Sequence, residues 1–561
     1  MKIIDNGFAA QAAVLEKTVR ARTGGEGPII TAELTADAGL GKPESFRIDK
    51  TAEGWRITGA DAAGVLFGIG KFLHTAKWSA TTFEPDPPQS LIEPHCSVRA
   101  IYAANHFYNW YQMASDEELE RYFTELALWG YNTIILHMPF IMCEHLDDEV
   151  WKRFARSTKR IFGIARRLGM HTGLVQSPNQ GTKDTPDSVR ADLSFDRPTR
   201  GHAGINVCPS NPEGLAWLRR QWVLLFETFR EEGLDYLVAF PYDEGGCGCE
   251  KCRPWGANGF VRMNMELRRI AKSYFPNLKI AMGTWTFDEP DDQGEYAGIY
   301  EKLRSGEAES EYLMIDSHTD FPEYALTHEP VRPVLDFPEI SMWGLFPWGG
   351  FGANPMPARF QRIWNSSKRL LDGGLPYSEG IFEDISKVQF AGYYWDPDRD
   401  WHDILREYIA YEADACIADD ALTLIDGIEA NAVAIGEQQV PDLELAVKTA
   451  ALARALDDRL PQRGKSAWRW RFLCIRALLD EKRYRWFFEK SGQTEEDLYV
   501  LRRYSGEILQ EDPEAQAMFK ELIAWDHAVP DNGSNRWTLP PAVGYADFKR
   551  RYGTKPKAKG L

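Results

Sequence analysis

The stretch that decides the fold is Tyr236-Leu-Val-Ala-Phe-Pro-Tyr-Asp-Glu-Gly-Gly-Cys-Gly-Cys-Glu-Lys-Cys252. Its opening residues, Tyr236 to Phe240, are apolar and stop at Pro241, which predicts a short buried parallel strand. Two adjacent carboxylates, Asp243 and Glu244, follow where this strand ends. In a barrel of alternating strands and helices, the catalytic groups lie at that end of the strands. A solvated turn or a helix N-cap is the alternative explanation for the two acids.

The sequence around this stretch repeats the same order of strand, loop and helix from Ser97 onward, which is typical of a parallel α/β fold. We expect strands at residues 98–103, 133–137, 171–175, 236–240, 279–283, 312–315, 340–345 and 377–381. We expect helices between most of them, at residues 117–128, 149–168, 214–231, 260–273 and 359–371. Eight strands within about 300 residues favour a (β/α)8 barrel over an open sheet.

The barrel region, residues 94–399, lies between two parts with different patterns. Residues 1–93 combine helical and short strand patterns and end in a Pro-rich linker, which predicts a small α+β accessory domain. In residues 400–561 the strand patterns give way to long helical ones, and we expect a helical C-terminal region. One helix there, at residues 467–489, carries aromatic residues at helical spacing, which more often form core than a platform for a sugar.

Charge and composition limit the partners of the protein. The 561 residues carry a formal net charge of −18, which argues against binding to the phosphates of nucleic acid. No stretch approaches the roughly 18 apolar residues of a membrane span, and the N-terminal residues lack the pattern of an export signal. We therefore expect a cytoplasmic protein with no nucleic-acid or membrane partner. The sequence does not decide between a monomer and a homo-oligomer.

Four of the eight cysteines are candidates for a metal site. Cys247, Cys249 and Cys252 crowd into six residues, a spacing that favours metal ligation in a reducing compartment. Tetrahedral zinc generally takes four ligands, and Cys208 precedes a helix in the neighbouring loop, so we expect it to be the fourth. Four thiolates leave no open position, which predicts a structural zinc ion. Buried free thiols are the main alternative, and a redox pair is disfavoured because only one residue separates Cys247 from Cys249.

The order of these parts resembles glycoside hydrolase family 20, the retaining β-N-acetylhexosaminidases. The segment from Gly54 to Gly70 is similar to the end of that family's accessory domain, and segments 98–107 and 131–137 are similar to its first two barrel strands. The most specific match is Asp243-Glu244 after the fourth strand. The resemblance covers roughly residues 45 to 250.

The sequence departs from the family 20 pattern in places. That family has His and two glycines before Asp-Glu, whereas this chain has Ala239-Phe-Pro-Tyr242, and Asn105 stands where an arginine is expected. The Cys-x-Cys-x-x-Cys run and the upstream Cys208-Pro-Ser-Asn-Pro-Glu213 look more like the related endo-β-N-acetylglucosaminidases of glycoside hydrolase family 163.

The resemblance implies a glycosidase that uses substrate-assisted catalysis. Glu244 would be the general acid that protonates the leaving oxygen, and Asp243 would orient the 2-acetamido group whose carbonyl serves as the nucleophile. If the substrate lacks this group, a second carboxylate must replace it, and the candidates are Asp316, Glu379 and Glu383. Two alternatives stay open. One is a two-carboxylate glycosidase acting on a uronic acid or a neutral sugar, as α-glucuronidases do, and the other is a non-catalytic carbohydrate-binding protein.

An oligosaccharide or glycoside site also needs flat apolar faces and polar partners near the strand ends. The expected aromatic wall consists of Trp285, Trp343 and Trp348. The expected polar contacts, besides the three acids named above, are Arg99, Asn105, His106, His137, Gln176, Asn179 and His318. One such residue alone is more often a satisfied core residue, whereas several on one face indicate binding.

Overall fold

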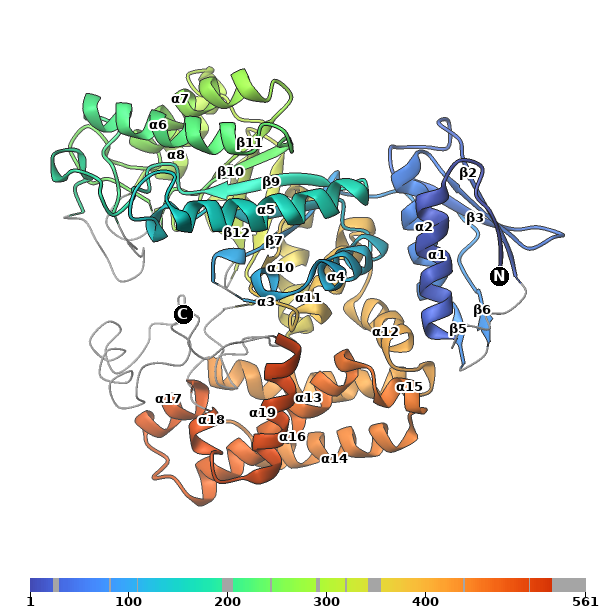
Figure 1. Ribbon diagram of the computed structural model, residues 1–561. Coiled ribbons are helices and arrows are strands. Elements are labelled where there is room, and N and C mark those ends of the chain that lie inside the picture. Colours follow the sequence, from blue (N-terminus) through green and yellow to red (C-terminus); the bar gives the residue numbers. More distant parts are fainter. Residues whose placement is uncertain are drawn as a thin grey trace.

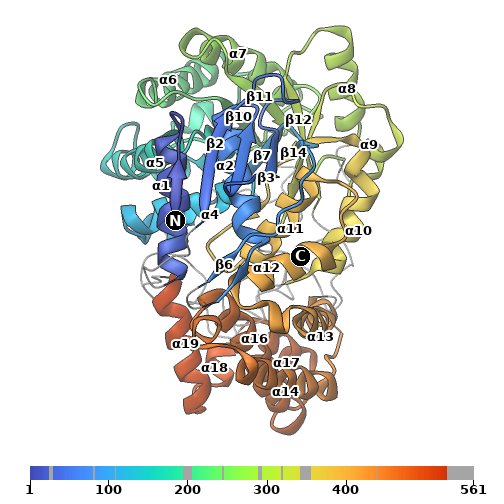
Figure 2. The same cartoon turned by 90° about the vertical axis from the view of Figure 1, so that its right-hand side faces the viewer.

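The computed structural model describes residues 1–23, 30–79, 82–107, 109–193, 205–242, 245–288, 293–317, 320–341, 355–436, 439–503 and 505–526. A closed barrel lies at the centre, with a small sheet and its helices on one side and a group of helices below (Figure 1). Figure 2 shows the same parts from the side of the small sheet. The predicted (β/α)8 barrel with an N-terminal α+β part and C-terminal helices is confirmed. The domain boundaries near residues 93 and 399 stay predictions.

The N-terminal part is a four-stranded sheet with two helices packed against it. The strands run in the order β1 (Lys2–Ile4), β2 (Thr31–Ala36), β4 (Trp55–Gly59) and β3 (Phe46–Lys50), and only β3 is antiparallel to its neighbour. The helices are α1 (Ala9–Arg22) and α2 (Ala62–His74). Helix α2 starts after Asp61 because that carboxylate accepts a hydrogen bond from the amide of Gly64 at 2.8 Å. A hairpin of β5 (Lys77–Trp78) and β6 (Phe83–Glu84) follows.

Eight parallel strands close the barrel. They are β7 (Val98–Ala103), β8 (Thr133–His137), β9 (His171–Gln176), β10 (Tyr236–Ala239), β11 (Lys279–Gly283), β12 (Tyr312–Ser317), β13 (Val334–Pro338) and β14 (Leu371–Gly374). Each strand pairs with the next one along the chain, and β14 returns to β7. The short strand β15 (Tyr377–Ser378) continues beyond β14 and pairs with the end of β7. The carboxyl ends of all these strands therefore meet at one mouth.

Helices connect the strands and surround the barrel. They are α3 (Trp110–Met113), α4 (Asp116–Leu128), α5 (Glu149–Arg167), α6 (Pro212–Thr228), α7 (Gly259–Tyr274), α8 (Glu295–Ser305), α9 (Glu323–Thr327), α10 (Pro357–Ser367) and α11 (Asp384–Trp395). Local signals set where they begin. Ser115 and Glu118 form a capping box at α4, and the carboxylate of Asp148 caps α5.

The seventh and eighth strands lie earlier in the chain than we predicted. The seventh is β13, and residues 340–341 lie beyond its end. The eighth is β14, at the place where we expected the end of a helix, and the predicted strand at 377–381 contains only β15. The prediction was wrong because prolines flank the alternating pattern of β13, and because β14 contains Gly373 and Gly374, which have no side chains to form a pattern.

The C-terminal part is helical. It contains α12 (Trp401–Glu412), α13 (Ala418–Gly436), α14 (Leu443–Arg459), α15 (Gln462–Lys465), α16 (Trp468–Glu489), α17 (Glu495–Arg503), α18 (Ser505–Ile508) and α19 (Pro513–Asp526). Most aromatic residues of α16 form core as predicted, since Trp470, Phe472, Tyr484 and Phe487 are buried, while Trp468 and Trp486 are partly buried. Within the described ranges, none of the helices combines the length and apolar character that crossing a membrane requires.

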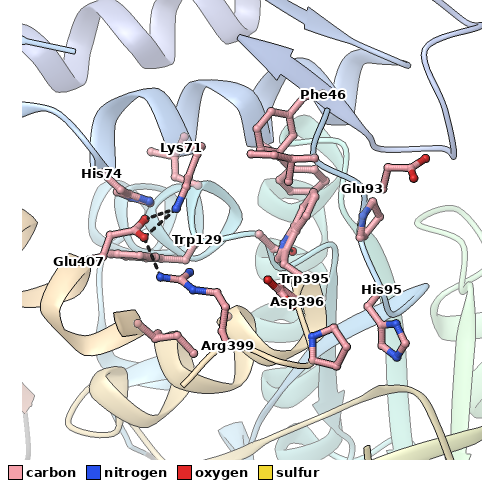
Figure 3. A pocket seen from close by; sticks show the side chains of 18 of the residues that line it. Phe46, Lys71, His74, Glu93, His95, Trp129, Trp395, Asp396, Arg399 and Glu407 are labelled. Carbon is pink, nitrogen blue, oxygen red and sulfur yellow. Dashed lines mark hydrogen bonds and ion pairs between the residues drawn. The ribbon is translucent and has the colours of Figure 1, made fainter. Parts of the chain in front are cut away.

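The N-terminal part and α12 meet at the end of the barrel where the strands begin. Glu407 on α12 forms ion pairs with Lys71 of α2 at 2.7 Å and with Arg399 at 3.0 Å. The imidazole ring of His74 stacks on Trp129, which follows α4, with the ring centroids 3.6 Å apart. These side chains line a cavity of about 690 Å³ (Figure 3). The cavity lies at the opposite end of the barrel from the mouth, so it is not the predicted active site.

We predict that His74 makes the protein less stable in mild acid. Burial lowers the pKa of His74 from 6.5 to about 3, so the unfolded chain binds a proton more readily than the folded protein does. Stability should therefore fall as the pH drops below 6.5, by roughly 1.4 kcal/mol at pH 5.5. Thermal unfolding of the wild type and of His74→Phe between pH 7.5 and 5 measures this. Phenylalanine keeps the stack on Trp129 but cannot take up a proton, so the variant should lose less stability over this range.

His328 provides the matched control, because its ring also stacks on a neighbour, Tyr324, yet it is exposed to solvent. His328→Phe should leave the pH dependence of the melting temperature as in the wild type. Equal slopes for His74→Phe and the wild type would contradict the prediction.

Below pH 4.5 a second loss of stability should begin, at Glu407. Burial raises the pKa of Glu407, but Lys71 and Arg399 outweigh it and lower that pKa to about 2, and the ion pairs weaken as the carboxylate takes up a proton.

Candidate active site

An aromatic floor lies inside the barrel just below the mouth. It consists of Tyr102, Phe240, Trp285, Phe337 and Tyr377, which come from five different strands or strand ends. Phe337 lies at its centre, since its ring centroid is 5.2 Å from that of Phe240, 5.7 Å from that of Trp285 and 5.8 Å from that of Tyr377. Trp285, which we predicted to contact a sugar, is the partly exposed member of this floor. A flat apolar surface of this kind suits the face of a pyranose ring.

Acidic residues lie on β12 and directly after β13 and β15, toward the mouth of the barrel. Side chains alternate along a strand, so the position two residues after an inward-facing one also points inward. Asp316 follows the inward-facing Met314 on β12, Glu339 follows Phe337, and Glu379 follows Tyr377. We call Asp316, Glu339 and Glu379 the acidic rim. The rim places several carboxylates where the barrel opens.

Glu379 is held by the aromatic floor beneath it. The hydroxyl group of Tyr377 donates a hydrogen bond to Oε1 of Glu379 at 2.9 Å, and both side chains are buried. Burial, and after it the charge of Glu379, raises the pKa of Tyr377 well above its ordinary value. The phenol therefore keeps its proton and remains a donor to the carboxylate.

Two histidines, His106 and His137, lie next to each other where the first and second barrel strands end. His106 belongs to the 3-10 turn η1 (Asn105–Phe107), and His137 ends β8. Their ring centroids are 4.5 Å apart, and both rings are buried. Asn105 accepts a hydrogen bond from the backbone amide of His137 at 2.9 Å, so its carboxamide joins η1 to β8.

The turn after β10 is anchored on both sides of the predicted catalytic pair, whose members Asp243 and Glu244 lie outside the described residues. Before the pair, the buried hydroxyl group of Tyr242 donates to Oε1 of Glu295 at 2.5 Å. After the pair, the amide of Gly246 donates to Oδ1 of Asn179 at 3.1 Å.

Asn179 joins this turn to the loop after β9. Its Nδ2 donates to the carbonyl oxygens of Gly246 at 2.8 Å and Val207 at 3.1 Å, and the side chain is fully buried. A Cβ atom at Gly245 would lie 3.0 Å from Oδ1 of Asn179, so a small residue is needed there. The sequence predicted a sugar contact for Asn179, but its carboxamide is used to hold the backbone.

Of two other predicted sugar contacts, the one at Arg99 was wrong, whereas the one at Glu383 stays a prediction. Arg99 is fully buried at the start of β7, where it pairs with Glu44 at 2.6 Å, because its side chain points out of the barrel toward the N-terminal part. Glu383 is buried, and its two oxygens accept hydrogen bonds from Ser341 at 2.5 Å and from Ser378 at 3.3 Å. Arg99 therefore joins the barrel to the N-terminal part, and Glu383 joins the segments that contain Ser341 and Ser378.

Of the remaining predicted contacts, the structure describes Gln176 only. Gln176 bridges β9 to the segment after β8 by donating to the carbonyl oxygen of Met138 at 2.9 Å. His318, Trp343 and Trp348 lie outside the described residues. Glu339 was not among the predicted contacts, because the seventh strand was expected to begin after this residue. The alternation of Leu335, Phe337 and Glu339 was the signal that could have found it.

The four predicted metal ligands come together beside the turn. The Sγ atoms of Cys208, Cys247, Cys249 and Cys252 all lie within 4.8 Å of one another. Cys208 precedes α6 in the loop after β9, and the other three belong to the loop after β10. Hydrogen bonds with Cys247, and then with Cys252, lower the pKa of Cys208. The geometry therefore suits a tetrahedral site with four sulfur ligands.

No protein-family model and no curated protein sequence matches the chain. Among solved structures it is similar to a family 89 glycoside hydrolase from Clostridium perfringens in complex with 2-acetamido-1,2-dideoxynojirimycin, with 11% identity and a TM-score of 0.60 over 99% of this chain and 76% of that one. It is also similar to a family 115 4-O-methyl-α-glucuronidase with specificity for decorated arabinogalactans, with 11% identity and a TM-score of 0.58 over 96% and 77% of the two chains. A mutant β-hexosaminidase from Streptomyces plicatus in complex with GlcNAc matches with 14% identity and a TM-score of 0.50 over 75% and 91%.

These similarities confirm the resemblance in fold to family 20 and extend it. The hexosaminidase matches three quarters of the chain, whereas the family 89 and 115 structures match nearly all of it, including the C-terminal helices. Identities of 11% to 14% show the fold alone. The chain therefore has the barrel architecture of these glycoside hydrolases.

We predict that Asn179→Ala destabilises the protein by about 1–3 kcal/mol, because it leaves the buried backbone groups of Gly246 and Val207 without their partner. Urea unfolding followed by tryptophan fluorescence measures the change. The control is Asn365→Ala, since Asn365 is exposed on α10, and that variant should stay within about 0.5 kcal/mol of the wild type. Equal stability of the two variants would show that the hydrogen bonds of Asn179 to Gly246 and Val207 add nothing to the free energy of unfolding.

Proposed function

We propose that the protein is a glycosidase that cleaves β-linked 2-acetamido sugars with the help of the substrate's own acetamido group. The observation that carries the proposal is the turn after β10, which is anchored through Tyr242 and Gly246 on either side of Asp243-Glu244. Enzymes with this barrel carry their catalytic groups at the carboxyl ends of the strands, and anchoring keeps such groups in register. The likeness in fold to several glycoside hydrolases supports the same reaction class.

The proposed roles follow the chemistry of glycosidic cleavage. Glu244 protonates the leaving oxygen, while Asp243 orients the acetamido group so that its carbonyl oxygen attacks the anomeric carbon. Water then opens the cyclised intermediate, with Glu244 acting as the base. The aromatic floor, with Trp285 as its partly exposed member, offers a flat face for the sugar ring.

The acidic rim favours a second candidate, a glycosidase that uses two protein carboxylates on a uronic acid or a neutral sugar. Asp316, Glu339 and Glu379 provide acids at the mouth in addition to the proposed acid Glu244. A uronic acid would also need a cation to bind its carboxylate. The basic side chains at the described ends of the barrel strands are the imidazoles of His106 and His137, which are weaker partners for a carboxylate than an arginine.

We predict that Glu244→Gln lowers kcat by at least about 100-fold on glycosides with poor leaving groups, because it removes the proton donor and keeps the shape. Substrates whose leaving group needs little protonation should be affected less. Glu250→Gln is the matched control, since Glu250 is an exposed acid in the same loop. A panel of nitrophenyl and methylumbelliferyl glycosides measures turnover. Sugar binding without turnover on any of them would instead support a non-catalytic carbohydrate-binding protein.

Asp243→Asn and Glu339→Gln distinguish the two candidate mechanisms. If catalysis is substrate-assisted, Asp243→Asn should reduce turnover of 2-acetamido sugars far more than Glu339→Gln does, and a thiazoline mimic of the cyclised intermediate should inhibit the wild type. If two protein carboxylates are used, substitution of a rim acid should abolish turnover, and azide should rescue it when the substrate is activated. Efficient cleavage of sugars without an acetamido group, together with no response to the thiazoline, would rule out the first mechanism.

A further inference from the structure

We propose that one zinc ion binds Cys208, Cys247, Cys249 and Cys252 and ties the loop after β9 to the loop after β10. The four Sγ atoms lie within 4.8 Å of one another, and those of Cys208 and Cys249 are 3.7 Å apart. In a regular tetrahedron with Zn–S bonds of about 2.3 Å, the sulfur atoms are about 3.8 Å apart. The thiols therefore already have nearly the spacing that zinc requires.

Polar side chains lie next to the proposed ligand Cys252. The guanidinium Nη2 of Arg262 donates to Oγ of Ser210 at 2.6 Å, and Ser210 Oγ lies 3.0 Å from Sγ of Cys252. A guanidinium can only donate, so Oγ of Ser210 accepts from Arg262, and its own hydrogen is available to a sulfur ligand at Cys252. Such contacts around the ligands orient them and tune metal affinity.

The backbone also holds the ligands in place. The amide of Cys252 donates to the carbonyl oxygen of Cys249 at 2.8 Å, which closes a turn between two ligands, and the amide of Cys208 donates to Val189 at 2.9 Å. Cys247 and Cys252 are fully buried. Four thiolates around Zn²⁺ carry a net charge of −2, and Arg262, which also donates to the carbonyl oxygen of Lys251 at 3.0 Å, is a nearby cation that offsets it.

The proposed ion has a structural role. Four sulfur ligands leave no position for water or substrate, so the ion does not take part in the reaction. Cys247 follows Glu244 by three residues. The zinc and the hydrogen bond from Asn179 to Gly246 would together hold the turn after the proposed catalytic pair. The proposal does not depend on the proposed function, because metal content and stability are measured without a substrate.

Metal analysis of the purified full chain tests the site. The wild type should contain about one zinc per chain, whereas Cys208→Ser should contain much less and melt at a lower temperature. The matched control is Cys416→Ser, since Cys416 is exposed in the C-terminal part, and it should keep the zinc. Full zinc content in Cys208→Ser would remove Cys208 from the site. Wild type that holds no zinc after preparation with added zinc, or that holds iron in its place, would overturn the proposal.

A milder variant covers the case in which Cys208→Ser does not fold. Ser210→Ala keeps all four thiols but removes the hydroxyl group that faces Cys252, and it should weaken zinc binding by about 10–100-fold in competition with a chromogenic chelator. Unchanged affinity would contradict the arrangement around Cys252. Titration of thiols in the denatured protein adds a further test, because a disulfide among the four cysteines would exclude the zinc site.

Discussion

The structure depends on the close approach of β14 to β7, where the barrel closes. Gly373 pairs with Val98, and a Cβ atom at Gly373 would lie only 2.0 Å from the carbonyl oxygen of Val98. At the next residue, a Cβ atom at Gly374 would lie 2.1 Å from the hydroxyl oxygen of Tyr394. Only glycine allows both contacts. Because the barrel closes there, the carboxyl ends of all eight strands meet, and residues as far apart in the chain as Tyr102 and Tyr377 form one floor.

The turn after β10 shows how contacts from distant segments hold the backbone on either side of the predicted catalytic pair. Its contacts come from three different places: Glu295 at the start of α8, Asn179 in the loop after β9, and the cysteine cluster next to α6. The first two contacts are buried, where hydrogen bonds gain strength from the low local dielectric and are costly to lose. A catalytic acid benefits from such support, since small displacements reduce the rate strongly.

The two ends of the barrel carry different kinds of contacts. At the end where the strands begin, charged and aromatic side chains such as Arg99, Lys71, His74 and Glu407 join the N-terminal part and α12 to the barrel. At the mouth, acids and imidazoles lie above an aromatic floor. This division explains why Arg99, which the sequence analysis assigned to a sugar, stabilises the fold instead. One residue's shift along β7 decides whether a side chain faces the interior or the N-terminal part.

The sequence by itself determined the features that depend on near neighbours in the chain: the apolar runs of the first six barrel strands, the position of Asp243-Glu244 after β10, and the three clustered cysteines. Only the tertiary structure decided which distant residues meet. It revealed Glu339 directly after a strand that ends in a proline, the pairing of the glycine-containing β14 with β7, and the backbone contacts of Asn179. The physical reason is that periodicity reports which side of a segment is apolar, whereas strand register and the closure of the barrel set which side chains reach the mouth.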